Sequence, residues 1–131
     1  MKRIYQQGRA AFKTASGSPT PENLHEWRKK AKLLGYGLEL IKGLGIRKNS
    51  RMIKGATDLS KALGDDHDLF MVKTALDREN RSRPAPDYAS VAKRISARRA
   101  KLQNRAFKPG AVVYAEKQGR FGKRLDRRFR R

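Results

Sequence analysis

Side chains that can bind an anion recur at helical spacing between residues 25 and 36. They are His25, Arg28, Lys29, Lys32 and Tyr36. On a helix that turns about 100° per residue they share one stripe, opposite an apolar face. The apolar face consists of Leu24, Trp27, Ala31, Leu34, Leu38 and Ile41. A purely solvated surface is one interpretation of the stripe, but it needs neither a histidine nor a tyrosine. Cations at positions i, i+3, i+4 and i+7 also repel one another unless an anion lies between them.

The composition favours a polyanionic partner. The chain has 131 residues with 33 basic and 12 acidic side chains, a net charge of +21. Residues 81–131 carry 17 of the basic and only 3 of the acidic side chains. So strong a balance in so short a chain is typical of proteins that bind nucleic acid or other polyanions.

Several classes of protein are excluded by what the chain lacks. It has no cysteine, which rules out disulfides, thiolate catalysis and zinc fingers. No apolar run approaches the roughly 18 residues of a membrane-spanning helix. The first residues have no apolar segment typical of an export signal. The sequence therefore predicts a cytoplasmic protein without membrane insertion, consisting of one domain over residues 1–131.

Helical periodicity must position the stripe, and no segment alternates as a strand would. Thr20 and Pro21 are a good N-cap and first residue for the helix that carries the stripe. Gly64 is expected to end the next helix, and Asp65 or Asp66 to cap the one after it. Pro109-Gly110 is expected to break the last long helix, which Asp87 caps. The expected helices span residues 1–15, 22–42, 50–63, 66–79 and 87–108, followed by a short piece at 111–117. A basic tail at 120–131, expected to be partly disordered, ends the sequence. This pattern predicts an all-α, antiparallel helical bundle.

Three motifs in order resemble the CHAD domain, the conserved histidine α-helical domain. Residues 24–39, LHEWRKKAKLLGYGLE, look like the signature helix of that family. Residues 59–69, LSKALGDDHDL, resemble its helix–glycine–acidic–helix corner. Residues 113–117, VYAEK, followed by Phe121 and Leu125, are similar to its closing segment.

The resemblance implies two related helical bundles that face each other across a basic channel. It implies binding of inorganic polyphosphate, association with polyphosphate granules, and no catalytic activity, cofactor or metal in this domain. The candidate polyphosphate-binding residues are His25, Arg28, Lys29, Lys32 and Tyr36, with Lys54, Lys61 and Lys117 as supporting cations. The chain has one signature helix and resembles the C-terminal half of the family. A homodimer or a missing N-terminal half is therefore expected to complete the channel.

The dipeptide His67-Asp68 suggests a different chemistry, because it resembles the core of HD-type phosphohydrolases. Those sites hold a divalent metal with a further histidine and aspartate, and His25 is the second histidine of this chain. The simpler interpretation is that Asp65 and Asp66 cap a helix whose first turn contains His67 and Asp68. A magnesium site at these aspartates would need oxygen ligands from elsewhere.

The alternative function is binding of a nucleic-acid backbone, either RNA or DNA. The residues that would suit it are Arg98, Arg99, Lys101, Arg105, Lys108 and the basic tail. Phe121 and Phe129 could stack on bases, although their helical spacing with Leu125 is more typical of packing. Nucleic acid therefore remains a competing polyanion for the same charge.

Overall fold

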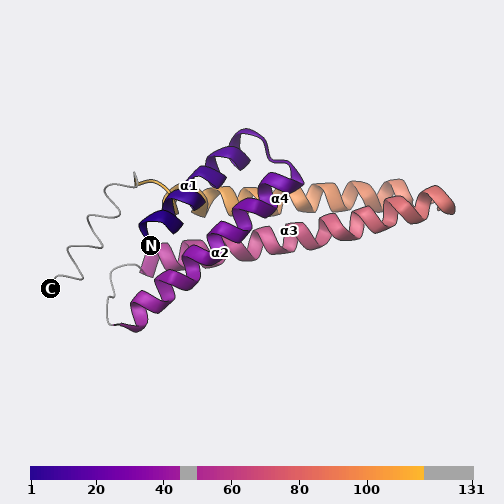
Figure 1. Cartoon of the computed structure of the whole chain (residues 1–131). Helices are drawn as coiled ribbons and strands as arrows, with labels where there is room; N and C mark the ends of the chain where they lie inside the picture. Colours follow the sequence, from indigo (N-terminus) through magenta and orange to yellow (C-terminus); the bar gives the residue numbers. More distant parts are fainter. Residues whose placement is uncertain (45–49, 117–131) are drawn as a thin grey trace.

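The computed structural model describes residues 1–44 and 50–116, and within these ranges it contains helices and no strand. The helices are α1 (Lys2–Gly17), α2 (Pro21–Gly43), α3 (Ser50–Ser82) and α4 (Tyr88–Val113). Figure 1 shows their order and packing. The prediction of an all-α helical bundle is confirmed. None of the helices in the described ranges has the length and apolar character needed to cross a membrane.

The start of α2 follows its sequence signals. The hydroxyl of Thr20 accepts a hydrogen bond from the backbone N–H of Asn23 at 3.2 Å, and Pro21 is the first helical residue. Glu22 lies in the first turn, where a negative charge is favourable. These contacts set where α2 begins.

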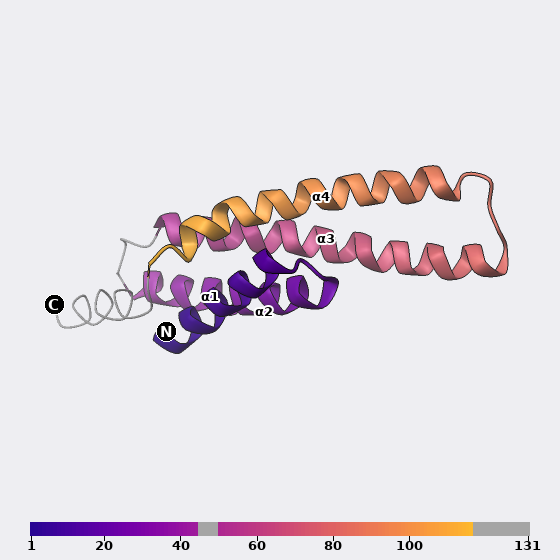
Figure 2. The ribbon, with the colours of Figure 1, turned by 90° about the horizontal axis from the view of Figure 1, so that it is seen from above.

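The four helices form two unequal regions. Helix α2 packs between α1 and α3, and α3 runs along α4. Figures 1 and 2 show that the α3–α4 pair continues well beyond the ends of α1 and α2. Figure 2 also places α2 and α4 on opposite sides of α3. We call the four-helix part the bundle end, and residues 67–94 the hairpin arm.

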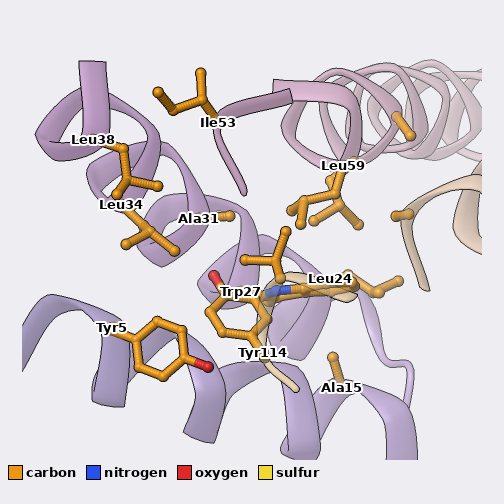
Figure 3. Close-up of a cluster of buried hydrophobic side chains, with 14 of the residues drawn as sticks. Tyr5, Ala15, Leu24, Trp27, Ala31, Leu34, Leu38, Ile53, Leu59 and Tyr114 are labelled. Atoms are coloured by element: carbon orange, nitrogen blue, oxygen red, sulfur yellow. The ribbon is translucent and has the colours of Figure 1, made fainter. Parts of the chain in front are cut away.

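Aromatic side chains build the core of the bundle end. Trp27 is fully buried, with its ring centroid 5.2 Å from that of Phe12 and 5.3 Å from that of Phe107. Tyr114 packs against Phe12 and Tyr5 at 5.6 Å in each case. Figure 3 shows Trp27 and Tyr114 among the aliphatic side chains of α2 and α3. These contacts join residues from α1, α2 and α4 to one core.

The predicted break at Gly64 is wrong, because α3 continues through it to Ser82. The helices expected at 50–63 and 66–79 are therefore one helix, and neither Asp65 nor Asp66 is a cap. The carboxylate of Asp66 is buried and accepts hydrogen bonds from Arg99 Nε at 2.9 Å and Gln103 Nε2 at 3.2 Å on α4. Packing of α4 along the whole length of α3 outweighs the weak helix propensity of a single glycine.

The predicted break at Pro109-Gly110 is also wrong, since α4 runs through both residues to Val113. A Cβ added to Gly110 would lie 2.7 Å from Cζ2 of Trp27. The glycine is thus a close-packing position under the indole ring, and the buried residues around it hold the last turn despite the missing proline N–H. The short helix expected at 111–117 does not form as a separate element within the described residues. Lys117 and the basic tail at 120–131 lie outside those residues.

The connection between α3 and α4 differs slightly from the prediction. Helix α3 extends to Ser82, into the expected linker, and Asp87 precedes α4 without a side-chain capping hydrogen bond. The side chain of Asn80 instead accepts a hydrogen bond from the N–H of Ala85 at 3.0 Å.

Candidate functional site

The stripe of α2 lies along the line where α2 meets α3. We call this line the α2–α3 seam. It is formed by His25, Arg28, Lys32 and Tyr36 of α2 with Ser60, Gly64 and His67 of α3. The two helices are antiparallel, so residue numbers rise along α2 while they fall along the facing side of α3. The structure therefore brings together four of the residues that the sequence singled out.

His25 stacks on His67 at one end of the seam. The ring centroids are 4.6 Å apart with an interplanar angle of 26°. Burial, then the neighbouring His67, Lys29 and Arg28, hold the pKa of His25 below its ordinary value of 6.5. Among the described residues, Nδ1 of His25 is buried and has no hydrogen-bond partner. The neutral form of His25 is thus favoured until a negative charge approaches.

Arg28 crosses the seam over Gly64. A Cβ added to Gly64 would lie 3.2 Å from Nε of Arg28, so the guanidinium occupies the space that a side chain would fill. Within the described part of the chain, Nε is buried without a hydrogen-bond partner and no carboxylate forms an ion pair with this guanidinium. Packing, and not an ion pair, holds the arginine in place.

A groove of about 370 Å³ continues the seam beyond Arg28. Its walls are Lys32, Gly35, Tyr36 and Glu39 of α2 and Ala56, Thr57 and Ser60 of α3. The small residues Gly35 and Ala56 leave space at the bottom of the groove. Tyr36 is 67% exposed, and its hydroxyl is therefore accessible at the rim as a donor.

The remaining predicted site residues lie elsewhere. Lys29 is exposed and forms an ion pair with Glu26 at 2.8 Å, and Lys30 approaches the same carboxylate at 3.7 Å. Lys54 is exposed on α3. Lys61 lines a different groove, between α3 and α4. The seam therefore contains fewer cations than the stripe suggested.

Three residues of the seam, Ser60, Gly64 and His67 of α3, were missed as site residues by sequence reasoning. Gly64 was interpreted as a helix end and His67 as part of a first turn, whereas both face α2 from the middle of α3. The spacing of Ser60, Gly64 and His67 at i, i+4 and i+7 was a signal for one helical face.

The metal-site interpretation of His67-Asp68 gains no support from this geometry. Asp68 is exposed, and Asp66 is engaged by Arg99. Over the described ranges, no three histidine, aspartate or glutamate residues come together in a way that could hold a metal ion.

The fold and the seam define a class, an all-helical bundle with a partly unpaired cationic line between two helices. The CHAD domain family matches residues 1–77, more than half of the chain. The chain belongs to this family, which is associated in general with polyphosphate binding. The matched region includes α1, α2 and most of α3, and hence the whole seam. No curated protein and no solved structure matches the chain.

Proposed function

We propose that this protein binds inorganic polyphosphate along the α2–α3 seam, as a binding module and not as an enzyme. The observation that carries the proposal is the state of Arg28 and Lys32. Both cations lie at the seam, and neither has an ion pair with a described carboxylate. Lys29, by contrast, is already paired with Glu26.

Each seam residue offers a different contact to a chain of phosphates. Arg28 can donate two parallel hydrogen bonds to one phosphate, and Lys32 supplies a mobile point charge. Tyr36 donates from the rim, and His25 gains a proton when phosphate reverses the local field. Lys29, Lys54 and Lys61 contribute from outside the seam by long-range attraction. In a cell, such binding would concentrate the protein on polyphosphate granules.

The test is a double substitution, Arg28→Gln with Lys32→Gln, compared with Lys2→Gln and Lys13→Gln. The control removes the same charge from exposed positions on α1. We expect the seam variant to bind long-chain polyphosphate about tenfold more weakly, because charge-assisted hydrogen bonds are lost. The slope of log affinity against log salt should fall by about 1.4, or about 0.7 for each of the two lost phosphate contacts. Equal affinity of the seam and control variants would contradict the proposal.

Competition at fixed salt separates polyphosphate from nucleic acid. Long-chain polyphosphate should displace the labelled polymer at lower phosphate concentration than duplex DNA or RNA does. If DNA or RNA competes equally well, the protein is a general polyanion binder and the specific proposal fails. Polyphosphate incubated with the protein and Mg²⁺ should keep its chain length, and shortening would overturn the non-enzymatic assignment.

A further inference from the structure

A second groove lies on the other side of α3 from the seam, and we call it the α3–α4 groove. Its volume is about 510 Å³, larger than the groove at the seam. The α3 wall consists of Asp58, Lys61, Ala62 and Asp65, and the α4 wall of Arg98, Leu102, Arg105, Lys108 and Pro109. Four of these nine residues are cations.

The cations of the α4 wall form a row. Arg98, Arg105 and Lys108 are exposed and follow one another at i, i+7 and i+10, along roughly 15 Å of helix. Arg105 and Lys108, three residues apart, are neighbours on the helix surface, and their like charges repel unless an anion compensates them. Lys61 approaches the same groove from the opposite wall.

Within the described ranges, Lys61, Arg98, Arg105 and Lys108 have no role in the fold as ion-pair partners. Among the residues that the structure describes, none of them forms an ion pair. Their neighbour Arg99 provides the contrast, since its Nε lies 2.9 Å from the carboxylate of Asp66. Asp58 and Asp65 also line the groove, so the net charge of its lining is +2. The groove retains a positive charge that folding leaves uncompensated.

We propose that the α3–α4 groove is a second polyphosphate-binding site, so that one protein chain is bivalent for the polymer. The identity of the ligand rests on the proposed function, whereas the site itself rests on the groove and its unpaired cations. Arg98, Arg105 and Lys108 contact the phosphates from α4, and Lys61 contacts them from α3.

The lining of the groove favours a single inorganic chain over single-stranded nucleic acid. Single-stranded nucleic acid is usually held by aromatic side chains on which bases stack. No aromatic residue is among those that line this groove.

The two sites are separate because α3 lies between them. Figure 2 shows α2 and α4 on opposite flanks of α3, and a helix with its side chains is about 10 Å across. Tripolyphosphate is too short to span that width and should occupy each site independently. A long polymer can occupy both sites, or two polymers can be joined by one protein.

Calorimetric titration with tripolyphosphate tests the number of sites. The groove variant is Arg98→Gln, Arg105→Gln and Lys108→Gln, and its matched control is Lys2→Gln, Arg3→Gln and Lys13→Gln on α1. We expect the unaltered chain and the control to bind about two equivalents and the groove variant about one, as for independent sites. Two equivalents bound by the groove variant would overturn the second site.

Light scattering with long-chain polyphosphate tests bivalency. The unaltered protein and the control should cross-link the polymer into large species at low salt, and the groove variant should bind without cross-linking. Equal scattering by the groove variant and the control would overturn bivalency. The seam variant, Arg28→Gln with Lys32→Gln, keeps the two proposals distinct. If it binds two equivalents with unchanged affinity while the groove variant binds one, the seam proposal fails and the groove stands.

Discussion

The bundle end and the hairpin arm are stabilised in different ways. At the bundle end, Trp27, Tyr5 and Leu34 are fully buried in one core. In the hairpin arm every residue from 67 to 94 is described, and none is fully buried. Since buried apolar area is the main source of stability, the arm contributes little of its own.

Polar contacts hold the arm instead. At its base, Arg99 pairs with Asp66 and lies 5.2 Å above the ring of Phe70. Near its tip, Asp77 accepts hydrogen bonds from the hydroxyl of Tyr88 and from Lys73 Nζ. The seam and the α3–α4 groove both lie toward the bundle end, so the region with the buried core presents their cations.

The largest expected effect comes from Trp27→Ala, which should cost roughly 3–5 kcal/mol of unfolding free energy because a fully buried indole is lost. Phe70→Ala, at a half-buried position of the arm, should cost about 1 kcal/mol. Denaturant unfolding monitored by circular dichroism measures both. Similar losses for the two variants would remove the distinction between the regions.

Asp66→Ala should have the next largest effect, about 1–3 kcal/mol, because it leaves the guanidinium of Arg99 and the amide of Gln103 without their shared acceptor. The double substitution Asp66→Leu with Arg99→Leu should cost less, since an apolar pair can replace an ion pair of this kind and only the amide of Gln103 then lacks its acceptor. The double-mutant cycle, with Asp66→Leu and Arg99→Leu as the single variants, is measured by the same denaturant unfolding. If the losses of unfolding free energy in the two single variants simply add in the double variant, the Asp66–Arg99 pair does not stabilise the base of the arm.

Acid should loosen the tip of the arm before the bundle end. The hydroxyl of Tyr88, followed by the ammonium of Lys73, holds the pKa of Asp77 below its ordinary value of 3.8. A depressed carboxyl pKa contributes stability that is complete above the ordinary value and is lost as pH falls through the folded value. Hydrogen exchange of amides at residues 77–91, corrected for the intrinsic rate, should therefore accelerate in that window.

Tyr88→Phe is the control for the tip, because it removes the main cause of the shift in Asp77. The same hydrogen bond raises the pKa of Tyr88 above its ordinary value of 10.0, so its contribution is lost as pH rises through the folded value. Tyr88→Phe should flatten both ends of the exchange profile. A profile identical to that of the unaltered chain would show that the contact does not stabilise the tip.

The smallest expected effect concerns His25, whose folded pKa is lowered mainly by burial. Without an anion, its contribution to stability is complete above its ordinary value of 6.5 and is lost as pH falls through the folded value. Polyphosphate should raise the pKa, so affinity should improve over the same fall in pH.

His25→Gln tests whether stability falls while polyphosphate affinity rises as the pH is lowered. His67→Gln is the matched control, since His67 is the other member of the stacked pair. His25 faces a small cavity that is also lined by His67, Asp66 and Arg99. The charged groups on α2 that affect its pKa are Arg28, Lys29 and Glu26. Thermal unfolding and polyphosphate affinity are measured between pH 5 and 8, where an ordinary histidine titrates. If the profiles of His25→Gln match those of the unaltered chain, His25 does not cause the pH dependence.

The sequence allowed the buried face of α2 to be predicted better than the lengths of α3 and α4. Thr20 and Pro21 mark the start of α2, and the apolar positions of its wheel are the buried ones. Both are local properties that periodicity and capping report directly. The stripe of His25, Arg28 and Lys32 followed from the same wheel.

What could not be predicted depends on contacts between distant residues. Gly64 and Gly110 were interpreted by their intrinsic preference to end helices. In the fold they make room for Arg28 and Trp27, which are far away in the sequence. The division of cations between the seam and the α3–α4 groove likewise depends on how α4 packs on α3. Lys61 lies on the α4 side for that reason.

The position of Arg28 over Gly64 has a consequence for how a flexible polymer is captured. Ordering a long side chain at an interface usually costs about 0.5–1.5 kcal/mol in conformational entropy. For Arg28 the bundle imposes that order during folding, because the guanidinium is already confined between the helices. Lys32 still has to be ordered when the polymer binds. A phosphate chain moving along the seam would therefore meet one preorganised contact among adaptable ones, and Arg28 would fix where its register begins.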